Sequence, residues 1–196
     1  MAAFKDCIDL RFAVSDHVGN RAISDVFPRL IQLGEQQLNQ RLRTVWQQTD
    51  DTLSFQDGEA DLPSDFLEML HVYGLNGSQM RAGMRSDQHR PGTSFSTYSI
   101  GAGKAYIRGF SGDRDITYYA AIPTLSNSLS SSNWLLEQFP DVYLYAVALQ
   151  AAKFLKDVEL SQATDQLLSF ALQSIKVEDE RARWSNGIVR VQGMTP

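Results

Sequence analysis

Metal binding and nucleophilic catalysis require histidine, cysteine and carboxylate side chains at short, defined spacings. The chain has three histidines and one cysteine. His17, His71 and His89 are far apart, and none has another histidine, a cysteine or a carboxylate at the spacing of zinc ligands. Cys7 falls on the apolar face of a predicted helix, which indicates a buried thiol rather than a nucleophile. We therefore expect no metal site and no cofactor.

A glycine-rich segment from Gly101 to Lys104 resembles part of a phosphate-binding loop. The first glycine of that motif is missing, and Ala105 stands where a serine or threonine would bind magnesium. Strand-like residues follow instead of a helix, so a hairpin turn is the better interpretation. The sequence also lacks the Gly-x-Ser-x-Gly motif of serine hydrolases.

Clustered carboxylates could supply acid–base catalysis or a calcium site. Asp113 and Asp115 fall in a predicted solvated turn, without the further oxygen ligands of a calcium loop. Asp61, Asp65 and Glu68 could form a carboxylate pair, although Asp65 is equally suited to capping a local turn. These groups do not form a recognisable catalytic arrangement, and we predict that the protein is not an enzyme.

Four tyrosines fall in one predicted β region: Tyr98, Tyr106, Tyr118 and Tyr119. Such rings can stack on sugars or bases. More often they fill the face of a small sheet, and basic residues are not interleaved with them as nucleic-acid binding requires. We favour a core role and keep glycan binding as an alternative.

Composition limits the remaining classes of protein. The 196 residues are 43% hydrophobic, with 23 acidic against 18 basic side chains and a net charge of −5. This predicts a globular fold with its own core and argues against a basic surface that wraps nucleic acid. No apolar run approaches the roughly 20 residues of a membrane helix, and the first residues lack a signal-peptide pattern. We expect a protein of a reducing, aqueous compartment that does not bind membranes.

The elements that position these residues form three zones, of which the first, residues 1–48, is helical. Apolar residues recur at helical spacing, and Gly19 can end a first helix. Ser24 and Asp25 suggest the cap of a second helix that runs to Trp46. Both helices are predicted to contribute to a bundle.

Residues 49–125 are broken by glycine and proline and predict a lobe of short antiparallel strands. Asn76 and Gly77 form a hairpin signal, and 115–122 is the clearest strand. Residues 83–94 show no periodicity and predict an exposed loop.

Residues 126–183 return to helical periodicity. Pro140 opens one helix and a second runs from Glu159 to Arg183, with a break so short that the two should pack antiparallel. Residues 184–196 predict an extended tail with free backbone groups. The predicted fold class is α+β, mainly α: an antiparallel helical bundle built from both chain ends, with an inserted small antiparallel β lobe, as one structural domain.

Several motifs, in order, resemble those of tailed-bacteriophage head-to-tail adaptor (head completion or connector) proteins. They lie at 62–67 (LPSDFL), 118–126 (YYAAIPTLS), 134–136 (WLL), 140–146 (PDVYLYA) and 151–157 (AAKFLKD). The residues that carry the resemblance are Leu62, Pro63, Asp65, Phe66, Tyr118, Tyr119, Pro123, Trp134, Pro140, Asp141 and Tyr145.

The resemblance implies a virion protein, made in the host bacterial cytoplasm, that assembles as a ring, usually of twelve copies, beneath the portal. It implies contacts with the portal protein on one side and with tail or nozzle proteins on the other. Double-stranded DNA would pass through the channel without sequence-specific binding. By position in the family, the predicted portal-docking residues are Glu178, Arg181, Arg183, Trp184, Ile188, Val189, Arg190 and Val191. A tail-tube or nozzle subunit is the second alternative.

Overall fold

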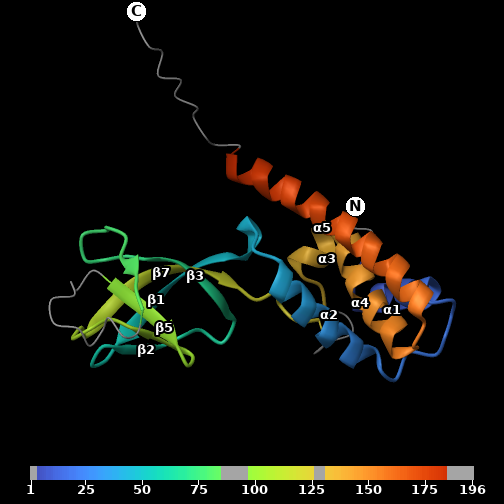
Figure 1. Cartoon of the computed structure of the whole chain (residues 1–196), viewed down its shortest axis with the longest axis horizontal. Coiled ribbons are helices and arrows are strands. Elements are labelled where there is room, and N and C mark those ends of the chain that lie inside the picture. Colours follow the sequence, from blue (N-terminus) through green and yellow to red (C-terminus); the bar gives the residue numbers. More distant parts are fainter. Residues whose placement is uncertain (1–3, 85–96, 126–130, 185–196) are drawn as a thin grey trace, which may run out of the picture. The chain divides into compact units, whose positions relative to one another are not determined.

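The computed structural model describes residues 4–84, 97–125 and 131–184, and the chain divides into two compact units. Residues 1–46 and 122–196 form one, called here the helical unit; Gln47–Ala121 form the other, the β unit. Figure 1 shows helices in the first and strands in the second. The predicted mixture of helices and antiparallel sheets is confirmed. Most of the predicted loop at 83–94 lies outside the described residues.

The first two helices of the helical unit are α1 (Cys7–His17) and α2 (Phe27–Arg41). Asp6 caps α1, where its carboxylate accepts hydrogen bonds from two backbone N–H groups of the first turn. The predicted cap of α2 at Ser24 and Asp25 is wrong: the helix starts later, without a side-chain cap, and with Pro28 in its first turn.

The predicted run of this second helix to Trp46 is also wrong. Leu42 is extended, and a short 3₁₀ turn, η1 (Val45–Gln47), follows. Arg43 explains the early end, because its guanidinium donates to the backbone carbonyls of Asn39 and Leu42, at 2.6 Å each. A side chain thereby satisfies carbonyls at the end of the helix.

Three helices complete the helical unit: α3 (Trp134–Gln138), α4 (Pro140–Phe154) and α5 (Val158–Trp184). Pro140 and Asp141 open α4 as predicted, because proline lacks an N–H that the first turn would leave unpaired. The central helix is α4, which contacts α1, α2, α3 and α5. Small residues allow this: a Cβ atom added at Gly34 of α2 would lie 3.2 Å from the side chain of Val147.

The β unit contains two sheets. One has the strand order β1 (Gln48–Phe55), β7 (Gly112–Ala120), β3 (Phe66–Val72), and all its pairs are antiparallel. The other has the order β2 (Glu59–Asp61), β6 (Lys104–Tyr106), β5 (Thr97–Gly101), β4 (Arg81–Ala82). The β5–β6 hairpin confirms the turn predicted in place of a phosphate loop, whereas β4 pairs parallel with β5 and departs from the antiparallel prediction.

Apolar side chains from both sheets form the core of the β unit, among them Leu53, Phe55, Ile107 and Ile116. Tyr98 and Tyr118 belong to this core and Tyr119 is also buried, which confirms the core interpretation for three of the four tyrosines; Tyr106 is half-buried. The solvated turn predicted around Asp113 and Asp115 is wrong, because both lie in β7.

Candidate assembly surfaces

The C-terminal end of α5, predicted as the start of a docking segment, is fixed by the carboxylate of Asp179. This carboxylate is buried; Oδ1 accepts the N–H of Val45 at 2.6 Å and Oδ2 accepts Nε of Arg183 at 2.7 Å. Arg183 also donates to the backbone carbonyl of Arg43 at 3.3 Å. Charge-assisted hydrogen bonds of this kind are the stronger ones in proteins. The last turns of α5 are therefore held against the segment that follows α2.

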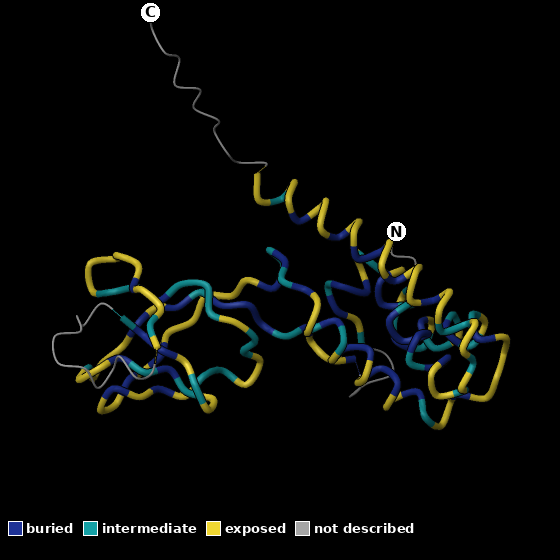
Figure 2. Tube along the Cα trace, viewed as in Figure 1, coloured by how far each residue is buried: buried dark blue, intermediate teal, exposed yellow. Residues whose placement is uncertain are grey.

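The outer side of the same turns is open to solvent. The tube at this end of the helix is coloured mostly as exposed (Figure 2). Trp184 is exposed, and Arg181 forms an ion pair with Glu178 at 2.6 Å. Trp184 is the last residue of α5, one position beyond the predicted helix end. The remaining predicted docking residues, Ile188, Val189, Arg190 and Val191, lie outside the described residues.

The structure brings two of the sequence motifs together in the β unit. The phenol of Tyr118 donates to the carboxylate of Asp65 at 3.0 Å, and the ring of Phe66 stacks on that of Tyr118 at 5.7 Å between centroids. The backbone carbonyl of Asp65 accepts the N–H of Ala121 at 2.7 Å. Burial and the adjacent carboxylate raise the pKa of Tyr118 to about 12. Asp65 is thus a structural hydrogen-bond acceptor, and it lies in the turn that connects Leu62 and Pro63 to β3.

The remaining motif residues lie in the helical unit. Trp134 stacks on Trp46 at 6.2 Å between ring centroids, and the side-chain amide of Asn133 donates to the carbonyl of Pro123 at 2.6 Å. Tyr145 of α4 meets the ring of His17 edge to face. These contacts connect segments distant in sequence, so these motif residues contribute to the packing of the helical unit.

Glu35, whose fit to the family resemblance gave no indication of its structural role, is the central polar group of the helical unit. It is buried on α2, and its Oε1 accepts the hydroxyl of Tyr143 at 2.5 Å and the N–H of Leu125 at 2.7 Å. Its Oε2 accepts the hydroxyl of Thr124 at 2.8 Å. Burial, with the charge of Glu35, raises the pKa of Tyr143. The carboxylate joins α2, α4 and the segment before α3.

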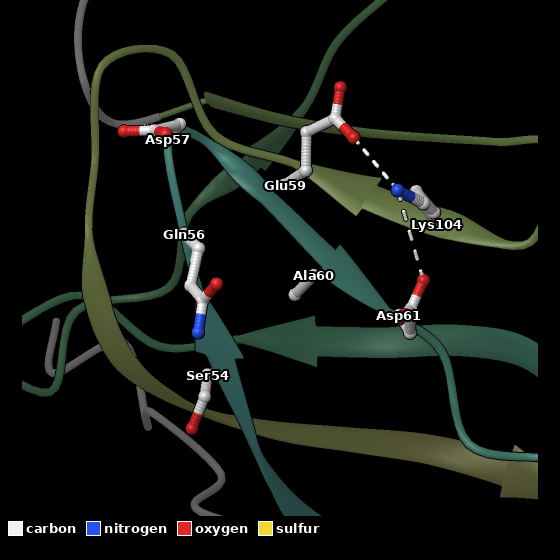
Figure 3. Close-up of a pocket in the computed structure, with 7 residues that line it drawn as sticks. All are labelled: Ser54, Gln56, Asp57, Glu59, Ala60, Asp61 and Lys104. Carbon is white, nitrogen blue, oxygen red and sulfur yellow. Dashed lines mark hydrogen bonds and ion pairs between the residues drawn. The ribbon is translucent and has the colours of Figure 1, made fainter.

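A polar groove of about 470 Å³ lies on the β unit (Figure 3). Lys104 donates to the carboxylate of Glu59 at 2.9 Å and lies 4.0 Å from that of Asp61. The hydrogen bond that Lys104 donates to Glu59 raises the pKa of Lys104. Exposed ion pairs of this type contribute little to stability. The lining residues are Ser54, Gln56, Asp57, Glu59, Ala60, Asp61 and Lys104.

One face of the β1–β7 pair carries a ladder of carboxylates and hydroxyls. Directly paired residues bond across the strands: Thr117 to Asp50 at 2.6 Å, Thr52 to Asp115 at 2.9 Å, and Ser54 to Asp113 at 2.7 Å. Asp50, Asp113 and Asp115 are all exposed. The ladder therefore gives the β unit a negatively charged outer face.

The residues considered for chemistry occupy structural positions. Cys7 is buried, and desolvation raises the pKa of its thiol. His17 bonds to the hydroxyl of Thr164 at 3.0 Å, and burial lowers its pKa. His89 lies outside the described residues. Across the part of the chain that the structure describes, no three histidine, cysteine or acidic residues converge as metal ligands.

A family model described as SU10 adaptor protein matches residues 5–192, nearly the whole chain. The chain belongs to this family of phage head-to-tail adaptors. The resemblance carried by the ordered motifs is thereby confirmed. No curated protein matches the chain.

Membership makes the protein a structural adaptor of a bacteriophage and a component of the virion. For such an adaptor the relevant sites are surfaces that meet other proteins. The described residues of the adaptor include no helix long and apolar enough to cross a membrane.

Proposed function

We propose that the adaptor assembles as a ring of identical copies that docks on the portal protein and connects the capsid vertex to the tail. The helical unit acts as an antiparallel bundle built from both chain ends, and packaged double-stranded DNA passes through the ring. Family membership supports this assignment most directly. The protein acts through its surfaces and needs no cofactor.

The end of α5 is the proposed portal contact. Asp179 and Arg183 fix the backbone of the last turns, while Arg181 and Trp184 face solvent. A large exposed aromatic side chain beside an arginine is the composition that interface hot spots favour. Because the supporting residues are already ordered, docking there would lose little conformational entropy.

The acidic balance of the adaptor suits the proposed passage of DNA. The ladder of Asp50, Asp113 and Asp115 places exposed carboxylates on one face of the β unit. Such carboxylates repel phosphates and disfavour non-specific binding of DNA. DNA would then slide without being held.

The proposal is tested with purified adaptor and purified portal protein by native mass spectrometry. Full-length adaptor should add to the portal as a complete set of copies. Two variants should lose binding while keeping a normal circular dichroism spectrum: Trp184→Ala, and a chain shortened by residues 185–196. Phe12→Ala removes another exposed aromatic side chain, from α1, and serves as the matched control.

The results of these binding experiments distinguish the candidate functions. Normal portal binding by both variants would show that the docking site lies elsewhere. If the full-length adaptor binds tail components on both faces and never the portal, it is a tail-tube or nozzle subunit. Binding to glycans without any portal binding would favour the tyrosine-rich β unit as a glycan-binding module.

A further inference from the structure

Helix α5 carries a second apolar face in addition to the one that it buries. Its buried face includes Leu168, Leu172 and Ile175. Three further large apolar side chains of α5 lie in line on another side of the helix and are exposed, with relative exposures of 39%, 66% and 47%; they are Leu167, Phe170 and Val177, respectively. We call these three residues the α5 stripe. An isolated exposed apolar residue is ordinary, but an aligned row on one helix marks a contact surface.

The spacing of the α5 stripe indicates what kind of surface would cover it. Successive members are three and seven residues apart, which is the spacing of core positions in a seven-residue helical repeat. A row with this period stays in contact with a second helix that crosses at a shallow angle. From Leu167 to Val177 the row is about 15 Å long at 1.5 Å per residue. The covering element is therefore a helix of about three turns or more.

The charges beside the α5 stripe favour a basic partner. Glu159 and Glu180 lie beyond its two ends and are exposed. Arg181, next to Glu180, is neutralised by the ion pair with Glu178. The ends of the stripe thus present net negative charge, and a helix with an exposed cation and a central apolar side chain would complement it.

The outward face of α2 in this same chain has those properties. Leu33 is exposed there, and Arg29, one turn before it on the same side of the helix, is an exposed cation. The single acidic residue of α2, Glu35, is buried. The other exposed residues of this face are the glutamines Gln32, Gln36 and Gln40.

Within one copy, the α5 stripe and α2 lie on different sides of α5. Arg41 of α2 reaches Asp165 of α5 at 4.0 Å. Asp165 lies about 140° around the helix from Phe170 and about 160° from Leu167, at 100° per residue. The stripe therefore points away from the α2 of its own chain. Two different, complementary surfaces that face apart are what a head-to-tail contact between identical subunits requires.

The geometry points to a contact in which the α5 stripe of one adaptor packs on the outward face of α2 of the next copy. This inference rests on the ring formation proposed above and names the surfaces that would build it. One helix pair is a small interface, since stable complexes bury about 1,200–2,000 Å². We therefore expect weak self-association of the free chain and full assembly only when the portal gathers the copies.

Photo-crosslinking tests the contact in the full-length chain. A photoreactive benzoylphenylalanine replaces Phe170, and ¹⁵N-labelled and unlabelled chains are mixed so that adducts between copies differ in mass from adducts within one copy. The sample is irradiated twice, as the concentrated free chain and after addition of portal protein. We expect an adduct between copies that maps to α2. The same replacement at Phe12, which is exposed but off the α5 stripe, should give no such adduct.

The crosslinked adducts identify which protein segment covers the α5 stripe. An adduct to the portal protein, an adduct within one chain, or the absence of an α2 adduct in both samples overturns the inference. If portal binding fails altogether, the proposed function fails, yet the concentrated free chain still tests the contact. The double variant Leu167→Gln, Phe170→Gln should lower self-association by about tenfold or more. Single copies should still bind the portal, because the substituted positions lie outside the docking residues.

Discussion

Replacing Glu35 by alanine is the most direct test of how the helical unit holds its parts together. The carboxylate accepts three hydrogen bonds, from Tyr143 of α4 and from the backbone and side chain of the 124–125 segment. Alanine removes the acceptor and leaves the donors in place. The substitution therefore asks whether this network, rather than apolar packing alone, positions the segment that leads into α3.

The expected loss follows from the burial of the donors. The N–H of Leu125 and the hydroxyl of Tyr143 belong to buried residues, and each buried donor left without an acceptor costs about 1–3 kcal/mol. Thr124 is exposed, so its hydroxyl can turn to water at little cost. Summing the two buried donors, we expect Glu35→Ala to lower the free energy of unfolding of the helical unit by about 4 kcal/mol.

Urea denaturation followed by tryptophan fluorescence measures this loss in the helical unit alone. The protein has three tryptophans, Trp46, Trp134 and Trp184, and all belong to that unit. Gln36→Ala is the matched control, because it changes the neighbouring, exposed residue of the same helix and should cost less than about 0.5 kcal/mol.

The variant Glu35→Gln separates charge from shape. Glutamine keeps one oxygen that can accept from Leu125 and Tyr143, so we expect a smaller loss, of about 1–2 kcal/mol, from the weaker neutral hydrogen bonds. A loss below about 1 kcal/mol for Glu35→Ala, or equal losses for alanine and glutamine, would refute the reasoning.

Two further predictions concern ionisation and backbone geometry. The pKa of Tyr143 is raised above 10.0 in the folded protein, so its contribution to stability is full below pH 10.0 and is lost as the unfolded chain ionises at higher pH. The free energy of unfolding should therefore fall above pH 10.0, and Tyr143→Phe should reduce that fall by about 1.4 kcal/mol per pH unit. Gly58 has a φ of +86°, and a Cβ there would lie 2.7 Å from the carbonyl of Ile107. Gly58→Ala should therefore destabilise the β unit by about 2–3 kcal/mol in thermal circular dichroism, whereas Gly77→Ala, at φ +68° with open space, should cost about 1 kcal/mol.

The parts of the fold that local chemistry determines could be predicted from the sequence. Pro140 and Asp141 mark the start of α4 because their preferences act within one helical turn. The apolar periodicity of α5 likewise needs no distant partner. The end of α2 could not be predicted, because the side chain of Arg43 folds back onto the helix carbonyls and competes with further helix.

Contacts between residues distant in sequence explain the other features that could not be predicted from the sequence. Asp113 and Asp115 are predicted in a turn because aspartate is depleted in strands, yet hydroxyls of β1 donate hydrogen bonds to both carboxylates, in a ladder that only the strand register creates. Glu35 looks like one more polar residue of a helix, since its partners lie about 90 residues and more along the chain. The order of the family motifs along the chain predicted the adaptor family, which no local pattern of residues indicated.

Helix α5 has three roles: packing in the helical unit, the proposed contact between copies through the α5 stripe, and the proposed portal contact at its end. Different residues of the helix carry each role. Ile175 and Val177 are two residues apart, about 200° around the helix, so one is buried in the unit and the other is exposed in the α5 stripe. Asp179, on the buried side, ties the last turns to Val45. Substitutions on the buried side should therefore weaken folding, whereas those on the α5 stripe should weaken only assembly. An adaptor that folds as a single copy and assembles later needs this separation, because a stripe that also held the fold together could not stay exposed before its partner arrives.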